Sequence, residues 1–202
     1  MMLVAFNKPY GVLSQFMPPT AAGEPVATRH RTLSEFGFPE GVYPIGRLDA
    51  DSEGLLLLSD EPGLNSLLLG PGNRHPRAYW AHVENNPAQA DLDRLVRGVM
   101  LDGRRTLPAQ ARILDPQPDV PDRVPPIRVR KLIPTCWIEL VLSEGKNRQV
   151  RRMTAAIGFP TLRLVRVRIG SFSLAGLAPG AWRALGQRDR RLVLDRPERN
   201  TR

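Results

Sequence analysis

Hydrophobic residues in this chain gather in short runs that turns and charged residues separate. One run consists of four consecutive leucines, residues 55–58, with charged residues directly before it. A short apolar run with such boundaries predicts a strand that is buried on both faces. Further strands are predicted over residues 3–6, 77–83, 136–142 and 161–169. The last of these has a mixed pattern, which indicates a bulge or burial on both sides.

Capping residues and terminal glycines between these strands mark short helices. The predicted helices cover residues 32–35, 60–69, 86–97 and 147–157. Two proline-rich stretches, residues 17–31 and 115–126, predict loops. The pattern therefore indicates a mixture of strands and helices, with no sign of an internal repeat.

The predicted helix over residues 147–157 has two contrasting faces. Apolar residues recur on one face at spacings of three and four, which predicts burial. Basic residues occupy the other face: Arg148, Arg151 and Arg152. Because this basic stripe starts near a helix N-terminus, which itself favours anions, contact with an anionic partner is a stronger expectation than a merely solvated face.

Charge changes this picture more than any other compositional property. The formal net charge is +9, and nearly all of the excess comes from arginine, since the chain has only three lysines. Arginine binds phosphate with two parallel hydrogen bonds and stacks on bases. We therefore expect a polyanionic partner rather than only a solvated basic surface. Charge alone does not separate RNA from DNA.

Composition excludes several other classes of protein. A chain of 202 residues forms one domain or two small lobes, and 42% hydrophobic residues indicate a globular protein. No apolar run is long enough to span a membrane, and the first residues do not resemble a secretory leader. One cysteine, Cys136, excludes an internal disulfide, and three histidines give no zinc cluster. We expect a cytoplasmic protein without membrane or metal.

The candidate chemistry lies in the stretch VYPIGRLDADSEGLLLLSD, residues 42–60. It sets Arg47, Asp49, Asp51 and Glu53 directly before the leucine strand, so a rigid element would hold the charged turn. Three interpretations compete. The carboxylates could only stabilise the turn. They could form a calcium loop, although helices do not flank the turn as such a loop requires. Asp49 could also be a nucleophile or general base beside a phosphate-binding Arg47. The motif alone does not separate the first interpretation from the third.

Three stretches together resemble one family. GRLDADSEGLLLLSD resembles the catalytic motif of pseudouridine synthases of the RsuA type, which act on ribosomal RNA. EGKNRQVRRMTAAIGFPTLRLVRVRIG, residues 144–170, resembles the C-terminal motif of that family, and FNKPYGVL, residues 6–13, resembles its first strand and turn. The stretches lie in the family's order, and with weaker matches they cover residues 2–185. PPIRVRKLIPTCW, residues 125–137, supports the E-type branch of large-subunit (23S) rRNA enzymes.

This resemblance implies an α+β pseudouridine synthase fold. Two lobes, about residues 1–78 and 79–186, would share a mixed, largely antiparallel sheet with a central active-site cleft. Residues 1–186 would form the catalytic domain without an N-terminal S4 RNA-binding domain. Residues 187–202 are polar and rich in arginine, and we expect them to form a basic, mobile tail.

The implied reaction converts uridine to pseudouridine in ribosomal RNA, with 23S rRNA or an assembly intermediate as the expected substrate. The reaction involves no redox step and no external group, so no cofactor is expected. The enzyme is expected to act as a monomer. The base must leave its stack to react, and arginine contacts to phosphate would offset that cost. The rival functions are a non-catalytic RNA- or ribosome-binding protein with this fold and a metal-dependent phosphotransferase.

Site residues follow from matching the family's motifs to this sequence. Asp49 would be the single catalytic carboxylate, acting as a nucleophile or as a base. Tyr79 would stack on the uracil and assist proton removal, and Arg151 would pair with Asp49 and favour its ionised form. Asp51 and Glu53 are expected to point away from Asp49. The residues expected to bind substrate are Lys8, Arg47, Arg148, Gln149, Arg152 and Leu162 or Leu164.

Overall fold

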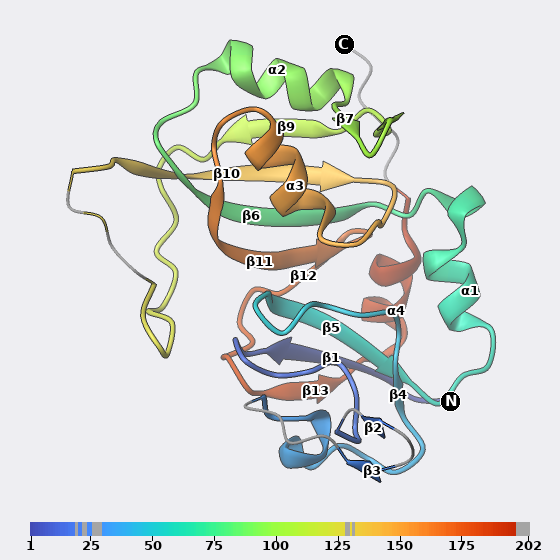
Figure 1. Ribbon diagram of the computed structural model, residues 1–202. Helices are drawn as coiled ribbons and strands as arrows, with labels where there is room; N and C mark the ends of the chain where they lie inside the picture. Colours follow the sequence, from blue (N-terminus) through green and yellow to red (C-terminus); the bar gives the residue numbers. More distant parts are fainter. Residues whose placement is uncertain (19, 22–23, 26–29, 128–129, 131, 197–202) are drawn as a thin grey trace.

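One mixed sheet forms the frame of the molecule (Figure 1). The computed structural model describes residues 1–18, 20–21, 24–25, 30–127, 130 and 132–196. The strands follow the order β13-β1-β5-β11-β6-β10-β9, with β12 paired to β11 and β4 paired to β5. Their bounds are Leu3–Lys8 (β1), Tyr43–Pro44 (β4), Glu53–Ser59 (β5), Arg77–Glu84 (β6), Gln110–Ile113 (β9), Thr135–Leu142 (β10), Thr161–Ile169 (β11), Phe172–Ser173 (β12) and Trp182–Ala184 (β13).

Helices and two small ribbons complete the fold. The helices are Leu33–Phe36 (η1) and Pro71–Asn73 (η2), both of the 3₁₀ type, and Leu64–Leu69 (α1), Gln89–Arg97 (α2), Gln149–Ala156 (α3) and Gln187–Leu194 (α4). The ribbons pair Thr20–Ala21 (β2) with Glu24–Pro25 (β3) and Met100–Leu101 (β7) with Arg104–Arg105 (β8). None of the helices in the described part of the chain has the length and hydrophobicity to span a bilayer.

The sheet has two halves that meet at one parallel pair of strands. In the upper half of Figure 1, α2 and α3 cover β6, β9, β10 and β11, and their apolar side chains form one core with those strands. In the lower half, β5 pairs with β1, and β1 with β13. β5 and β11 pair in parallel at two positions, Val165 with Glu53 and Arg166 with Gly54, while the other pairings of named strands are antiparallel. The mixed, largely antiparallel sheet that the sequence predicted is therefore confirmed.

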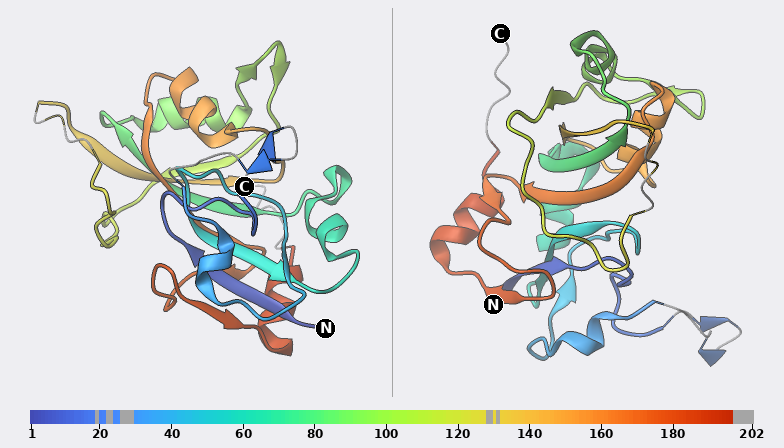
Figure 2. Two further views of the ribbon diagram at one scale, coloured as in Figure 1. Left: turned by 60° about the horizontal axis from the view of Figure 1, so that its bottom comes forward. Right: turned by 90° about the vertical axis from the view of Figure 1, so that its left-hand side faces the viewer.

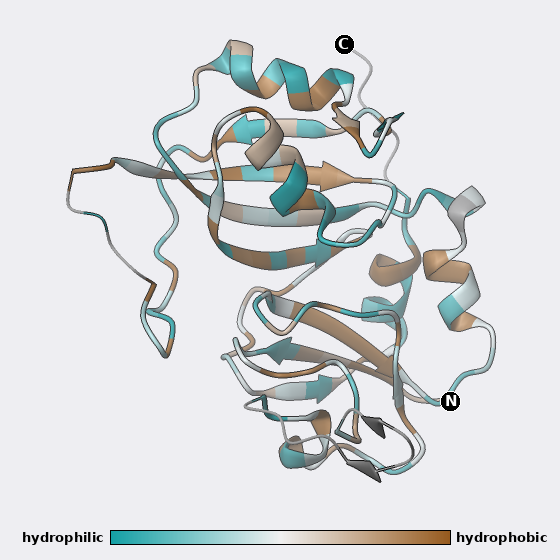
Figure 3. Ribbon diagram, in the orientation of Figure 1, coloured by the Kyte–Doolittle hydropathy of each residue, from teal (hydrophilic) through white to brown (hydrophobic). Residues whose placement is uncertain are grey.

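The four leucines of β5 are buried on both faces, as their uninterrupted run predicted. Leu55 and Leu57 belong to one core with side chains of α1, β12 and α4, whereas Leu56 and Leu58 belong to the core that contains Leu33 of η1. Figure 3 shows β5 as the most continuous hydrophobic strand of the lower half. This element fixes the position of the charged turn that precedes it.

The C-terminal part of the chain departs from the expected lobes and from the expected tail. β13 pairs with β1, so residues 182–194 return to the lower half instead of completing the upper one (Figure 2). Residues 187–194 form α4, whose Val193 is fully buried in the lower core. An ion pair of 2.6 Å between Arg190 and Glu61 fixes the helix further. The apolar part of α4 is only three residues long, Leu192 to Leu194, and arginines precede it. The sequence pattern of this segment therefore predicted a polar tail and not a packed helix. Residues 197–202 lie outside the described part.

Candidate active site

The turn before β5 is fixed by hydrogen bonds from an early segment of the chain. The Ser14 hydroxyl donates to the Leu48 carbonyl at 2.8 Å and accepts from the Leu48 N–H at 3.0 Å. The Gly11 N–H donates to the Ala50 carbonyl at 2.7 Å. Leu48 itself is buried in the core around η1. These contacts leave Asp49 on a rigid turn, with 39% of its side chain exposed.

Asp49 faces a cavity of about 270 Å³ between the two halves of the sheet. The turn that carries Asp49 forms one wall. Tyr79 of β6 and Leu164 of β11 contribute from the sheet, and the loop before α3 forms the opposite side. The expected cleft between two halves is therefore present, and residues from distant parts of the chain line it.

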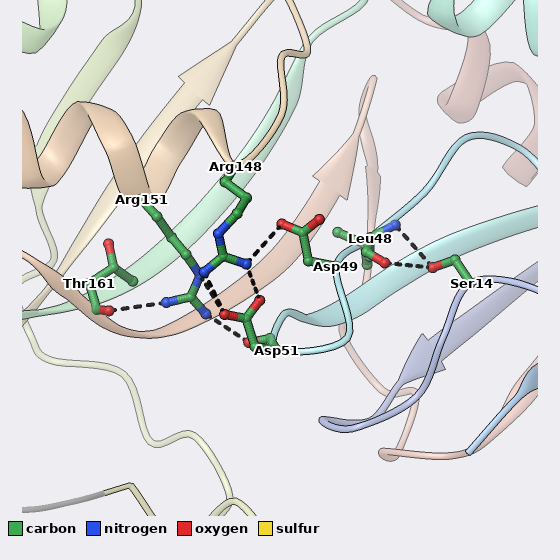
Figure 4. Close-up of polar contacts among 7 residues, drawn as sticks. All are labelled: Ser14, Leu48, Asp49, Asp51, Arg148, Arg151 and Thr161. Carbon is green, nitrogen blue, oxygen red and sulfur yellow. Dashed lines mark hydrogen bonds and ion pairs between the residues drawn. The ribbon is translucent and has the colours of Figure 1, made fainter. Parts of the chain in front are cut away.

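Two arginines at the start of α3, Arg148 directly before the helix and Arg151 within it, reach across to the turn (Figure 4). Arg148 donates to both carboxylate oxygens of Asp51, at 2.9 and 2.7 Å, and lies 3.6 Å from the Asp49 carboxylate. Arg151 donates to the backbone carbonyls of Asp51, at 2.7 Å, and of Thr161, at 3.0 Å, and its Nε lies 3.4 Å from the Asp51 carboxylate. The two halves are thus linked through Asp51.

This network corrects two expectations. Arg148, rather than Arg151, forms the ion pair with Asp49. Asp51 was expected to point away from Asp49, but both carboxylates contact Arg148. Arg148 precedes α3 with φ +47° and ψ +35°, a conformation that non-glycine residues rarely adopt, and this sets the start of its side chain apart from that of Arg151. Arg151 is anchored by backbone carbonyls instead.

Arginine contacts also neutralise the other carboxylates of the turn, Asp51 and Glu53. Although partial burial opposes it, the hydrogen bond from Arg148 and the charge of Arg151 hold the pKa of Asp51 below its usual value. Asp51 is therefore an ionised anchor for the two arginines. Glu53 is removed from the cavity altogether, since Arg163 binds it with two hydrogen bonds of 2.8 Å in a buried ion pair.

The cavity contains some of the residues expected to bind substrate and omits others. Arg47, Arg148, Gln149 and Leu164 line it, as Tyr79 does. Leu162 lies in a different, smaller cavity beside His82, because irregular pairing between Thr161 and Arg163 turns it away. Arg152 pairs with Asp102 at 2.5 Å, outside the cavity lining. The expectations for Leu162 and Arg152 are therefore corrected.

The expectation that Lys8 binds substrate is also wrong. Its side chain is fully buried and cannot reach a phosphate in solvent. Its ammonium donates to the carbonyls of Pro9, at 3.1 Å, and Val12, at 2.8 Å. Burial lowers its pKa to about 7, against the opposing charge of Glu53. The predicted strand ended at Phe6, whereas β1 continues through Lys8, so a lysine that was expected in a turn lies within the sheet.

Replacing Lys8 with methionine is expected to alter how stability depends on pH. Between the folded pKa of about 7 and the ordinary value of 10.5, the unfolded chain holds a proton that the folded chain lacks. The wild-type free energy of unfolding should therefore rise with pH across this window, by on the order of 2 kcal/mol relative to Lys8→Met. Urea unfolding at pH 7 and pH 9.5 measures the difference. A difference that stays constant would contradict this account.

Three basic residues of the cavity were not among the expected site residues: Lys146, in the loop before α3, and the arginines Arg77 and Arg166. Arg77 precedes Tyr79 by two positions in β6, and Arg166 follows Leu164 by two positions in β11. Because side chains alternate between the faces of a strand, residues two apart share a face. That spacing would have identified both arginines once Tyr79 and Leu164 were assigned to the site.

The calcium-loop interpretation does not fit the positions of the carboxylates. Asp49 and Asp51 face Arg148, and Glu53 is paired with Arg163 on another side. Within the ranges that the structure describes, no three His, Cys, Asp or Glu side chains are grouped as metal ligands. The turn arranges carboxylates for contact with guanidinium groups.

Comparisons with known proteins agree on one family. The family model described as RNA pseudouridylate synthase matches residues 2–156. A protein of Xanthomonas campestris named ribosomal large subunit pseudouridine synthase E is 52% identical over 182 residues, which are 90% of this chain and 94% of that relative. A protein of Vibrio vulnificus with the same name is 46% identical, over 91% of this chain and 74% of the relative.

The fold also has a solved counterpart. A crystal structure described as pseudouridylate synthase superposes with a TM-score of 0.74 and 25% sequence identity. The match covers 95% of this chain and 74% of the other one. The α+β architecture described above is therefore shared along almost the whole chain.

Proposed function

The chain belongs to the RNA pseudouridylate synthase family, and we propose that it isomerises one specific uridine of large-subunit ribosomal RNA to pseudouridine. The observation that carries this proposal is the position of Asp49, on a rigid turn at the mouth of a cavity rich in basic side chains. The names of the E-type relatives support ribosomal RNA of the large subunit as the substrate.

Catalysis would begin with the target base outside its stack. Exposed basic side chains at the rim of the cavity, Arg47, Lys146 and Arg148, would hold phosphates beside the extruded nucleotide. Tyr79 would stack on the uracil, and Leu164 would pack against its edge. Each phosphate contact makes binding more sensitive to salt, so RNA affinity should fall steeply as the salt concentration rises.

Asp49 would then act on the nucleotide, either as a nucleophile or as the base that removes a sugar proton. Arg148 lies near enough to favour its ionised form, and Arg151 supports the arrangement by anchoring Asp51. Breaking the glycosidic bond, rotating the uracil and forming a carbon–carbon bond involve no oxidation and no transferred group. These steps can proceed with side chains of the chain alone.

We propose further that the enzyme acts in the cytoplasm as a monomer. Its large exposed hydrophobic side chains come from different elements, such as Tyr43 of β4, Leu67 of α1 and Met100 of β7. Among the described residues, these side chains do not gather on one face of a helix or strand, as a contact with a partner subunit would require. Sedimentation of the purified protein tests the monomer.

Deleting the gene is expected to remove one pseudouridine from large-subunit ribosomal RNA. Pseudouridine mapping of ribosomal RNA from the deletion strain and from the same strain with the gene restored measures this. A non-catalytic RNA-binding protein would leave every modification in place, and that result would refute the proposal. If purified protein converts transcribed RNA in the presence of EDTA, a metal-dependent phosphotransferase is excluded as well.

A further inference from the structure

Two arginines in the lining of the cavity are themselves almost fully buried. Arg77 of β6 is 9% exposed, and Arg166 of β11 is 5% exposed. β6 and β11 are hydrogen-bonded neighbours, and Arg166 lies opposite Tyr79 in the register. The positive charge of Arg77 acts on Arg166 across this short separation. The cavity thus has a buried basic wall in addition to its exposed basic rim.

Neither buried guanidinium has a carboxylate within ion-pair distance among the described residues. Arg166 donates from Nε to the Leu55 carbonyl at 2.7 Å and interacts with the Tyr79 hydroxyl. The Nε of Arg77 has no hydrogen-bond partner. Burial lowers the pKa of Arg166, because a buried charge without a counter-ion is unfavourable.

A buried arginine elsewhere in the same strand shows the contrast. Arg163 is 7% exposed and is bound by both carboxylate oxygens of Glu53. Within the described residues, a buried guanidinium outside the cavity therefore has a carboxylate counter-ion, whereas the two buried guanidinium groups inside the cavity have none. An unpaired buried charge is stabilised if a ligand brings the opposite charge, so the cavity wall is suited to a negatively charged group.

The distribution of the lining residues indicates which part of a nucleotide that group belongs to. Exposed cations lie at the rim, where hydrated phosphates can bind. The buried arginines lie among flat or apolar side chains that suit a base: Tyr79, Leu142, Val150 and Leu164. The two acidic residues of the lining already have cationic partners, Asp49 with Arg148 and Glu144 with Lys146. The base, rather than a phosphate, is therefore the occupant that the wall fits.

We propose that Arg77 and Arg166 contact the carbonyl oxygens of the extruded uracil and stabilise the negative charge that it carries after the glycosidic bond breaks. The electron pair of the C1′–N1 bond passes to the ring and spreads over N1, O2 and O4. When C5 then bonds to C1′, that pair forms the new bond, C5 loses its proton and N1 gains one. Fixed positive groups aimed at a developing anion lower the barrier without reorganisation. This inference rests on the proposed function.

The test compares two leaving bases of different acidity. Single-turnover rates would be measured on an RNA with uridine or 5-fluorouridine at the mapped target, as loss of the target nucleoside by liquid chromatography with mass spectrometry. Loss of the nucleoside is the common readout, because C5 of 5-fluorouridine carries fluorine and cannot lose a proton after the new bond forms. Arg77→Gln and Arg166→Gln should slow the reaction of uridine by on the order of 100-fold. They should slow 5-fluorouridine much less, because the more acidic base carries its charge with less help. The rate with 5-fluorouridine divided by the rate with uridine should therefore rise about tenfold in either variant. A merely structural role would slow both substrates equally and would leave this ratio unchanged.

Two further variants make the test specific. Arg163→Gln removes a buried arginine outside the cavity and should keep the wild-type ratio, whatever its stability. Arg166→Lys retains a cation and should also keep that ratio. If Arg166→Gln does not fold, Arg77→Gln carries the test alone.

Other outcomes overturn the inference while leaving the proposed function intact. Equal slowing of both substrates would mean that the arginines only maintain the fold. A higher RNA concentration for half-maximal rate, with an unchanged ratio and a weaker salt dependence, would mean a phosphate contact. Failure of the wild-type protein to convert any uridine would instead refute the proposed function, and this inference with it.

Discussion

Replacing Asp49 with asparagine is expected to abolish pseudouridine formation, with a loss of at least about 10⁴-fold in the single-turnover rate. Asparagine has nearly the same shape but supplies neither a negative charge nor a nucleophilic or basic oxygen. The fold should be unaffected, because the Asp49 side chain is 39% exposed and its contact with Arg148 is long, at 3.6 Å. Thermal unfolding should therefore match the wild type within about 1 kcal/mol.

The neighbouring aspartate provides a matched control for this substitution. Asp51→Asn removes the same charge two residues away and breaks the hydrogen-bonded pair with Arg148 and the contact with Arg151. Because Asp51 only anchors these arginines in our account, its loss should lower the rate roughly tenfold rather than abolish it. Equal losses in the two variants would show that the turn needs its total charge and not a reacting group at Asp49.

Much of the fold could be predicted because the decisive patterns are local. The leucines of β5 are buried on two faces, and an uninterrupted apolar run is the expected signal of that environment. The apolar stripe of α3 is buried through Val150, Met153 and Ile157, as its spacing predicted. The motif resemblance added the pairing of the two halves, and the family match confirms the resemblance.

Other features depend on distances that no local pattern encodes. The irregularity in β11 decides that Leu164 faces the cavity and Leu162 does not, although both leucines fit the sequence pattern equally well. The choice between Arg148 and Arg151 as the partner of Asp49 depends on a left-handed backbone conformation at Arg148. Lys8 is buried because β1 continues through it and pairs with β5 at Gly54. Three-dimensional neighbours decided each of these cases.

The return of the chain to the lower half could not be foreseen either. β13 has three residues and α4 has eight, and arginines are frequent in both segments. Their fully buried contribution is Val193, which shares a core with Leu3 and Leu55, while Trp182 and Leu194 pack against the lower cores and are only partly buried. One buried valine among charged residues is too weak a signal for pattern analysis. The helix becomes part of the fold through the core that it shares with β1 and β5, far earlier in the chain, and through the nearby segment around β12, where the Ser171 N–H donates to the Leu192 carbonyl at 2.8 Å.

The junction of the two halves leads to the largest expected effect on stability, at Gly54. This residue has φ +99°, and it pairs with Arg166 in the short parallel contact between β5 and β11. A Cβ atom there would lie 2.4 Å from the Arg166 carbonyl oxygen and 2.8 Å from its amide nitrogen. Both atoms belong to the backbone, so side-chain rotation cannot relieve the contact. Gly54→Ala must therefore push the strands apart.

Gly158→Ala is a control that separates the two effects of Gly54→Ala, the collision of the added methyl group and the strain of a positive φ. Gly158 has a nearly identical φ of +97°, and a Cβ atom there would meet nothing within 4 Å. Gly158→Ala should lower the free energy of unfolding by about 1–2 kcal/mol through backbone strain alone. Gly54→Ala should lower it by at least about 2 kcal/mol more, because the added methyl group collides with a fixed strand. Urea unfolding of both variants measures the difference.

Since Gly54 lies five residues after Asp49 and opposite Arg166, Gly54→Ala should also slow the reaction, whereas Gly158→Ala should not. Equal destabilisation by the two substitutions would mean that β5 and β11 can separate without loss, and the two walls of the cavity would then not be held together by this contact.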